Sequence, residues 1–158
     1  MPKVEVAKKR VLDINPIAKV NIFQEFYLPT NTLNILDNTI TYIVDAMDTV
    51  SAKMQLIEEA KAKRIPIISS MGTGNKLEPN KFEISDIYET SVCPLAKIIR
   101  KECRKRGIEK LKVISSKEEP QNIEKQIDKD TGKQIAGTVS YIPSLAGLMI
   151  AGEVIKQI

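Results

Sequence analysis

Residues 41–48 have the sequence TYIVDAMD, a run of β-branched and apolar residues that ends in two aspartates. The run does not alternate between apolar and polar residues, which indicates a strand buried on both faces of a sheet. A helical pattern follows over residues 49–63, and residues 65–70 (IPIISS) have the pattern of a second short buried strand. The apolar stripe of the helix consists of Val50, Met54, Ile57 and Ala60. A strand, a helix and a strand at this spacing predict a parallel sheet with a right-handed crossover.

The segment before this unit predicts an amphipathic helix over residues 4–14, because its apolar residues recur every three or four positions. Pro16 ends that helix at Asn15. We expect a strand over residues 18–23 and a short helix or turn over residues 30–37.

The segment after the unit extends the same architecture. We expect, in order, an extended segment at 82–87, a helix at 94–107, a strand at 111–115, a polar loop at 117–134, a strand at 137–141 and an apolar helix at 143–155. The predicted fold class is α/β: a partial Rossmann-like, mostly parallel sheet with helices on both faces and additional C-terminal strands. We expect residues 1–158 to form a single domain.

The composition excludes several kinds of chemistry. The 158 residues carry a formal net charge of +4, with two cysteines and no histidine, so an imidazole base is excluded. Without a C-x-x-C pair we expect neither a tetrathiolate zinc site nor a disulfide-linked partner. The longest apolar stretch, residues 145–151, is too short to cross a bilayer. We therefore expect a cytoplasmic protein that acts away from membranes.

Asp48 is the first candidate site residue. It follows a parallel strand, and ligands of open α/β sheets bind outside the carboxyl ends of such strands. One interpretation is that Asp48 caps the next helix, as aspartate often does. The alternative is a carboxylate that holds Mg²⁺ on a nucleotide phosphate.

Two further features have a structural and a functional interpretation. Residues 71–76 (MGTGNK) follow a strand but lack the ending of a phosphate-binding loop, so we expect a loop with two positive-φ positions that faces a substrate. Cys93 precedes Pro94 at a predicted helix N-terminus, where a thiol can become nucleophilic. No histidine is present to activate it, and Cys103 is expected in the core.

Residues 97–112 contain eight basic residues and only two glutamates. This run is either a solvated helix face or a stripe that contacts phosphates of a nucleic acid. The candidates for nucleic-acid contact are Arg100, Lys101, Arg104 and Lys105. Aromatic residues do not interleave with the basic ones, so we expect no base stacking from this run.

Several motifs together resemble one family. Residues 1–5 (MPKVE) through 14–16 (INP), and residues 44–48 (VDAMD) followed by Lys53, resemble the ThiF/MoeB/HesA adenylating family, whose fold is Rossmann-like. The branch of tRNA threonylcarbamoyladenosine dehydratases is similar at four further stretches: 67–77 (IISSMGTGNKL), 86–88 (DIY), 92–96 (VCPLA) and 137–144 (GTVSYIPS).

The resemblance implies an activity and assigns site residues. It implies ATP- and Mg²⁺-dependent adenylation of a carboxylate, with threonylcarbamoyladenosine in tRNA as the substrate. By motif, Lys3 matches the lysine that contacts the ATP phosphates, and Asp48 matches the aspartate that positions Mg²⁺ and the phosphates. The family also implies a homodimer. Residues 42–44 are too apolar to lie at an uncovered sheet edge, so we expect either this dimer or a larger assembly.

The sequence also departs from the family. The glycine-rich G-x-G-G-x-G nucleotide-binding turn has no counterpart, so we expect the chain to correspond to the C-terminal portion of an adenylating domain. A truncated non-catalytic remnant that keeps tRNA or partner binding is therefore an alternative. A sulfur-carrier adenylyltransferase is a further alternative, which the missing C-x-x-C zinc motifs disfavour.

Overall fold

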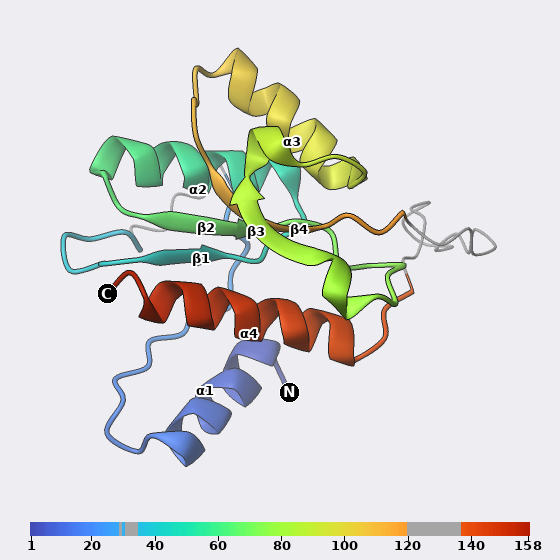
Figure 1. Cartoon of the computed structure of the whole chain (residues 1–158). Coiled ribbons are helices and arrows are strands. Elements are labelled where there is room, and N and C mark those ends of the chain that lie inside the picture. Colours follow the sequence, from blue (N-terminus) through green and yellow to red (C-terminus); the bar gives the residue numbers. More distant parts are fainter. Residues whose placement is uncertain (29, 31–34, 120–136) are drawn as a thin grey trace. The chain divides into compact units, whose positions relative to one another are not determined.

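The computed structural model describes residues 1–28, 30, 35–119 and 137–158. The chain forms two compact units, Met1–Leu33 and Asn34–Ile158, and each is described by itself (Figure 1). Half of the expected helix or turn at 30–37 and most of the polar loop at 117–134 lie outside the described residues. The single-domain interpretation stays a prediction.

The first unit contains one helix, α1 (Lys3–Ile14), in its described residues. The helix ends at Asn15, whose N–H donates to the Val11 carbonyl at 2.8 Å, directly before Pro16. The predicted helix is thus confirmed. The strand predicted at residues 18–23 is wrong, because a strand needs a hydrogen-bonded neighbour and none of the described residues pairs with this segment.

The second unit is built around a sheet whose described strands have the order β1-β2-β4-β3. These strands are β1 (Ile43–Asp45), β2 (Ile67–Ser70), β3 (Phe82–Asp86) and β4 (Lys112–Ser116). The neighbours β1, β2 and β4 run parallel, and β3 runs antiparallel to β4. The α/β fold and the mostly parallel sheet are confirmed.

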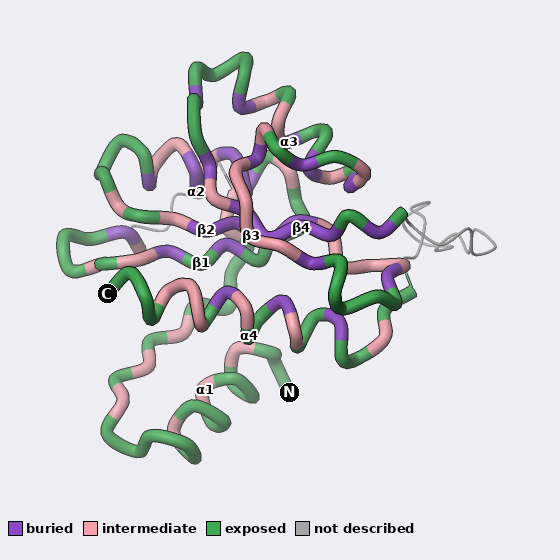
Figure 2. The backbone as a smooth tube through the Cα atoms, in the orientation of Figure 1, coloured by how far each residue is buried: buried purple, intermediate pink, exposed green. Residues whose placement is uncertain are grey.

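Helices cover both faces of this sheet (Figure 1). The helices α2 (Val50–Lys63) and α3 (Pro94–Lys105) pack on one face, in a core that includes Met54, Ile99 and Val113. The helix α4 (Tyr141–Ile155) packs on the other face, where Ile142 and Ile150 belong to a second core. Figure 2 shows that the buried residues follow the strands and the helix sides that face them.

Short 3₁₀ turns flank β3: η1 (Pro79–Lys81) and η2 (Ile87–Glu89). Among the described residues, every helix is too short or too polar to serve as a membrane span.

Two details of the second unit differ from the prediction. The strand predicted at 137–141 is wrong: residues 137–140 form no strand and α4 begins at Tyr141. Burial decides this segment, because a helix starting there places Ile142 in the core. Val44 is 50% exposed, so β1 is not buried on both faces. Its edge position in the sheet explains the exposure.

Candidate functional site

The carboxyl edge of the sheet brings together the segments that follow β1, β2 and β4. Because these strands are parallel, their last residues, Asp45, Ser70 and Ser116, all lie at this edge. The start of α3 lies here too, since a methyl group placed on Gly72 would be 3.6 Å from Cys93 Sγ. Ligands of open α/β sheets bind at this edge.

Asp48 is exposed in the turn between β1 and α2. Thr49, not Asp48, is the N-cap of α2, and no side chain caps this helix. The capping interpretation of Asp48 is therefore wrong. Asp48 Oδ1 accepts a long hydrogen bond, 3.5 Å, from the Thr49 hydroxyl. The Asp48 carboxylate is thus accessible to a ligand at the carboxyl edge.

A buried polar cluster lies beneath this turn and consists of Asp45, Lys53 and Ser69. Lys53 Nζ donates to Asp45 Oδ2 at 2.7 Å, to Ser69 Oγ at 3.0 Å and to the Ser70 carbonyl at 3.0 Å. Ser69 Oγ donates to Asp45 Oδ2 at 2.5 Å. Asp45 Oδ1 accepts the Met47 N–H at 3.0 Å. The cluster therefore joins the ends of β1 and β2 to the first turns of α2.

Burial sets the direction of the Lys53 pKa. Removal from water lowers the pKa of Lys53 below its ordinary 10.5, while the charge and hydrogen bond of Asp45, and the charge of Asp48, act in the opposite direction. Three simultaneous donations nevertheless require the ammonium form, because a neutral amine has two protons to give. The cluster is a charged pair that uses every proton of the lysine.

A second buried contact fixes the loop after β2. Lys76 is buried, and its ammonium donates to the backbone carbonyl of Glu118. The Glu118 carboxylate accepts the N–H groups of Leu77 at 3.0 Å and Glu78 at 2.9 Å. Burial lowers the pKa of Lys76, opposed by the charge of Glu118. The loop after β2 is thus tied to the segment after β4.

The backbone of residues 71–76 differs from the expectation of two positive-φ positions. Asn75 adopts φ 55°, and Gly72 and Gly74 do not have positive φ. Gly72 instead lies close to the Cys93 thiol, so that a methyl group added to it would be in ordinary van der Waals contact with the sulfur.

The cysteines are free and buried in the second unit. Cys93 is the N-cap residue of α3, as predicted, but its thiol is not accessible at the edge. Burial raises the pKa of Cys103 to about 11, so its thiol stays neutral at physiological pH. The described residues contain no group of three or more histidine, cysteine, aspartate or glutamate side chains that could hold a metal ion.

The basic residues of α3 are placed on one helix but differ in their contacts. Arg100 donates to the Thr90 carbonyl at 2.7 Å and to the Thr90 hydroxyl. The Arg104 guanidinium lies 5.3 Å from the centre of the Tyr88 ring, and Lys105 pairs with Glu102 at 2.8 Å. Lys101 is exposed. Three of the four candidates thus have partners within the chain.

Lys3 is the first residue of α1 and is exposed. It borders an open hollow of about 450 Å³ together with Phe23 and Phe26, all within the first unit. Lys3 and Asp48 belong to different units.

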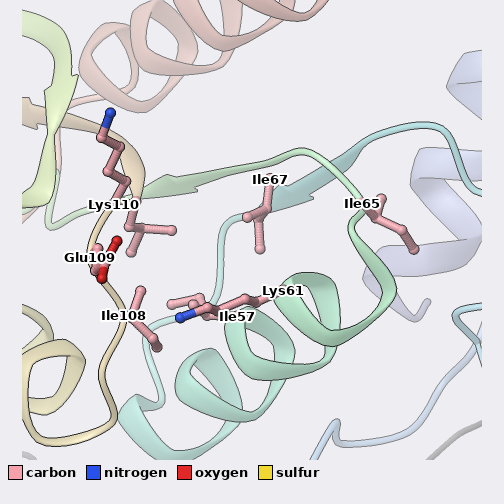
Figure 3. A pocket seen from close by; sticks show the side chains of 8 residues that line it. Ile57, Lys61, Ile65, Ile67, Ile108, Glu109 and Lys110 are labelled. Atoms are coloured by element: carbon pink, nitrogen blue, oxygen red, sulfur yellow. The ribbon is translucent and has the colours of Figure 1, made fainter.

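Another hollow, of about 300 Å³, lies at the amino ends of β2 and β4 (Figure 3). Its walls include Ile57, Ile67 and Ile108, and Lys61 at its margin donates to the Gly107 carbonyl at 2.7 Å. This hollow is largely aliphatic and lies at the opposite end of the strands from Asp48. It is not part of the candidate site.

Lys53 was named from the sequence only as part of a family motif, and the buried contacts of Lys53, Ser69 and Glu118 were not predicted. One signal was present for Lys53: it lies next to the apolar stripe of α2, one residue before Met54, where a lysine requires a buried partner.

Comparison with known proteins identifies relatives of this chain. The ThiF family matches residues 1–158. The tRNA threonylcarbamoyladenosine dehydratase of Bacillus subtilis is 36% identical over 167 residues, which cover 99% of this chain and 66% of the relative. The tRNA threonylcarbamoyladenosine dehydratase 2 of Saccharomyces cerevisiae is 30% identical over 178 residues, covering 99% of this chain and 40% of the relative.

Solved structures share the fold. The crystal structure of E. coli tRNA N6-threonylcarbamoyladenosine dehydratase in complex with ATP superposes with a TM-score of 0.83 at 22% identity, covering 98% of this chain and 63% of that one. The chain therefore spans less than two thirds of the length of these relatives. Because the family match extends over every residue of the sequence, the chain belongs to the ThiF family.

Proposed function

We propose that this chain forms part of an ATP-dependent enzyme that adenylates and dehydrates threonylcarbamoyladenosine in tRNA. The observation that carries the proposal is the exposed Asp48 carboxylate at the carboxyl edge of the sheet. It lies on a turn that the hydrogen bond from the Met47 N–H to Asp45 holds in place. Two relatives whose alignments cover 99% of this chain are named as tRNA threonylcarbamoyladenosine dehydratases. A tRNA substrate also makes the cytoplasm the expected location.

The residues at this edge fit a magnesium ion that arrives with a nucleotide. Mg²⁺ in such sites is held by one or two carboxylates together with substrate phosphates, and it keeps several waters. One accessible carboxylate suits that arrangement, whereas a metal site made of protein ligands alone needs more groups than the described residues bring together. Bound Mg²⁺ would neutralise phosphate charge as pyrophosphate leaves.

The chemistry requires positioning more than it requires a base. A carboxylate oxygen of the substrate attacks the α-phosphorus of ATP, the bond to pyrophosphate breaks, and an acyl adenylate results. A nucleophile within the same substrate then displaces AMP and closes a ring. Asp48 would orient the phosphates, and Lys3 would offset their charge. Neither role requires an imidazole base, and this chain contains no histidine.

A second candidate function is a non-catalytic chain that binds tRNA. The exposed basic residues of α3, including Lys101, favour this alternative.

The test uses the chain alone and joined to the segment of the Bacillus subtilis relative that it does not span. Pyrophosphate release and loss of water from threonylcarbamoyladenosine are measured with modified tRNA. We expect the joined protein to be active and Asp48→Asn to lower the rate about a hundredfold, or ~2.7 kcal/mol. Lys3→Ala should also lose most of the activity.

Glu109→Gln is the matched control, since Glu109 is an exposed carboxylate that borders the hollow at the opposite end of the strands. Full activity of a folded Asp48→Asn protein would refute the role of Asp48. A joined protein that binds tRNA without releasing pyrophosphate would support the non-catalytic alternative.

A further inference from the structure

The buried pair of Lys53 and Asp45 has a geometry that stability alone does not explain. Both side chains are fully buried, and each comes from a different element: the first turns of α2 and the last residue of β1. Burying two charges costs several kcal/mol per ion, and apolar replacements of such pairs are often equally stable. A buried pair is therefore weak evidence for a stabilising role.

The two oxygens of Asp45 connect the pair to the turn that carries Asp48. Oδ2 accepts from Lys53 and Ser69, and Oδ1 accepts the Met47 N–H at 3.0 Å. A carboxylate held on both sides cannot rotate without breaking one of these bonds. Lys53 thus fixes Asp45, and Asp45 fixes the backbone one residue before Asp48.

The same ammonium also reaches the neighbouring loop. Lys53 Nζ donates to the carbonyl of Ser70, the last residue of β2, directly before Met71. The register of the sheet places Asp45 beside Ser69, so both contacts come from adjacent strand ends. One side chain therefore sets the separation of the two loops that border the carboxyl edge. The pair is neutral as a whole and adds no net charge beside Asp48.

We propose that Lys53 and Asp45 are positioning residues, which hold the turn at residues 45–48 and the start of the loop at 71–76 so that the Asp48 carboxylate meets the nucleotide phosphates in one orientation. The proposal rests on the function proposed above for Asp48.

The first test measures the turn itself in the 158-residue chain by hydrogen exchange. Lys53→Met removes the three hydrogen bonds from Nζ and leaves the Asp45 carboxylate free to rotate away from the Met47 N–H. We therefore expect this variant to accelerate exchange at residues 46–49 by about tenfold. Met54→Ala is the control, because Met54 is a neighbouring buried residue of α2 that lies in the apolar core and has no place in the polar cluster. At an equal loss of thermal stability, Met54→Ala should leave the exchange of this turn unchanged.

If the single variants fold poorly, the double variant Asp45→Asn/Lys53→Met still tests the proposal. The double variant removes both charges, so its thermal stability should recover. Exchange at residues 46–49 should remain fast, because the Lys53 bonds to Asp45 and Ser70 are lost. Slow exchange at wild-type rate in the double variant would overturn the proposal.

The second test uses the joined protein and measures pyrophosphate release against Mg²⁺ concentration. We expect Lys53→Met to raise the Mg²⁺ concentration for half-maximal rate about tenfold, and Met54→Ala to leave it unchanged. If Asp48→Asn abolishes activity while Lys53→Met keeps the wild-type Mg²⁺ dependence, the positioning role alone is wrong. If Asp48→Asn has no effect, the proposed function fails first.

Discussion

Lys112 on β4 and Glu153 on α4 form an ion pair, with Lys112 Nζ 2.5 Å from Glu153 Oε1. The hydrogen bond from Lys112 holds the pKa of Glu153 below its ordinary 4.5. Burial, the next-largest effect, raises this pKa, and the charges of Lys112 and Lys156 lower it further. A carboxyl group whose pKa is lowered by folding stabilises the protein above its ordinary pKa. That contribution is lost as the pH falls through the lowered pKa of the folded state.

Glu153→Gln should therefore lower the melting temperature slightly at pH 7, and the difference should shrink at an acidic pH below the lowered pKa of Glu153, where both proteins are without the ion pair. Thermal unfolding followed by circular dichroism at the two pH values measures this. Glu109→Gln serves as a control and should change neither value. An equal effect of Glu153→Gln at both pH values would show that the pair is not the cause.

The exposed lysines of α3 should contribute to tRNA binding but not to thermal stability. Lys97 and Lys101 are exposed, so reversing both to Glu should weaken tRNA binding and reduce the log–log salt slope by about two. The melting temperature should hardly change, because solvated charges contribute little. Lys156→Glu is the control, since it changes the charge away from α3. Unaltered tRNA affinity at low salt would leave a solvated helix face as the explanation.

Arg100 should behave differently from the two lysines. Its guanidinium donates to the carbonyl and the hydroxyl of Thr90, so Arg100→Ala should destabilise the chain by about 1–2 kcal/mol. Urea denaturation measures this loss, and Lys101→Ala provides the comparison. Equal stability of the two variants would contradict a structural role for Arg100.

The two thiols should be unreactive in the folded chain. Both are buried and inaccessible to reagents, and burial raises the pKa of Cys103 to about 11, so Cys103 forms little thiolate at pH 8. A chromogenic aryl disulfide should react with neither cysteine under native conditions and with both in denaturant. Rapid native reaction confined to Cys93, located by mass spectrometry, would restore the nucleophile interpretation for that residue.

The 158-residue chain by itself should bind Mg·ATP weakly, with Kd above about 1 mM. Its sequence contains no G-x-G-x-x-G turn, the element that admits phosphates to a helix N-terminus in Rossmann-like folds. Calorimetric titration measures the affinity, and the joined protein is the positive control. Micromolar binding by the chain alone would contradict the prediction.

The chain should form a dimer or a larger assembly. In the described residues β1 pairs with β2 alone, and Val44 on this edge strand is 50% exposed. An uncovered apolar edge favours pairing with another chain. Val44→Lys should reduce the mass measured by light scattering, whereas Leu77→Lys, at another half-exposed apolar side chain, should not. A stable monomer at micromolar concentration would refute this prediction.

The sequence by itself determined the parts of the fold that local patterns encode. The β-branched run at 41–46 and the helical stripe after it predicted β1 and α2, and Pro16 and Pro94 marked helix boundaries, because proline constrains its own backbone and that of the preceding residue. The position of Asp48 at the carboxyl edge followed from strand direction alone.

Only the tertiary structure decided the elements and contacts that depend on distant partners. Residues 18–23 pair with no strand among the described residues, and burial of Ile142 made residues 141–155 a helix. The candidate site depended on the sheet in the same way. Lys53 meets Asp45 and Ser69 because parallel pairing aligns Asp45 with Ser69 over the first turns of α2, and a lysine can be buried only where such partners meet it.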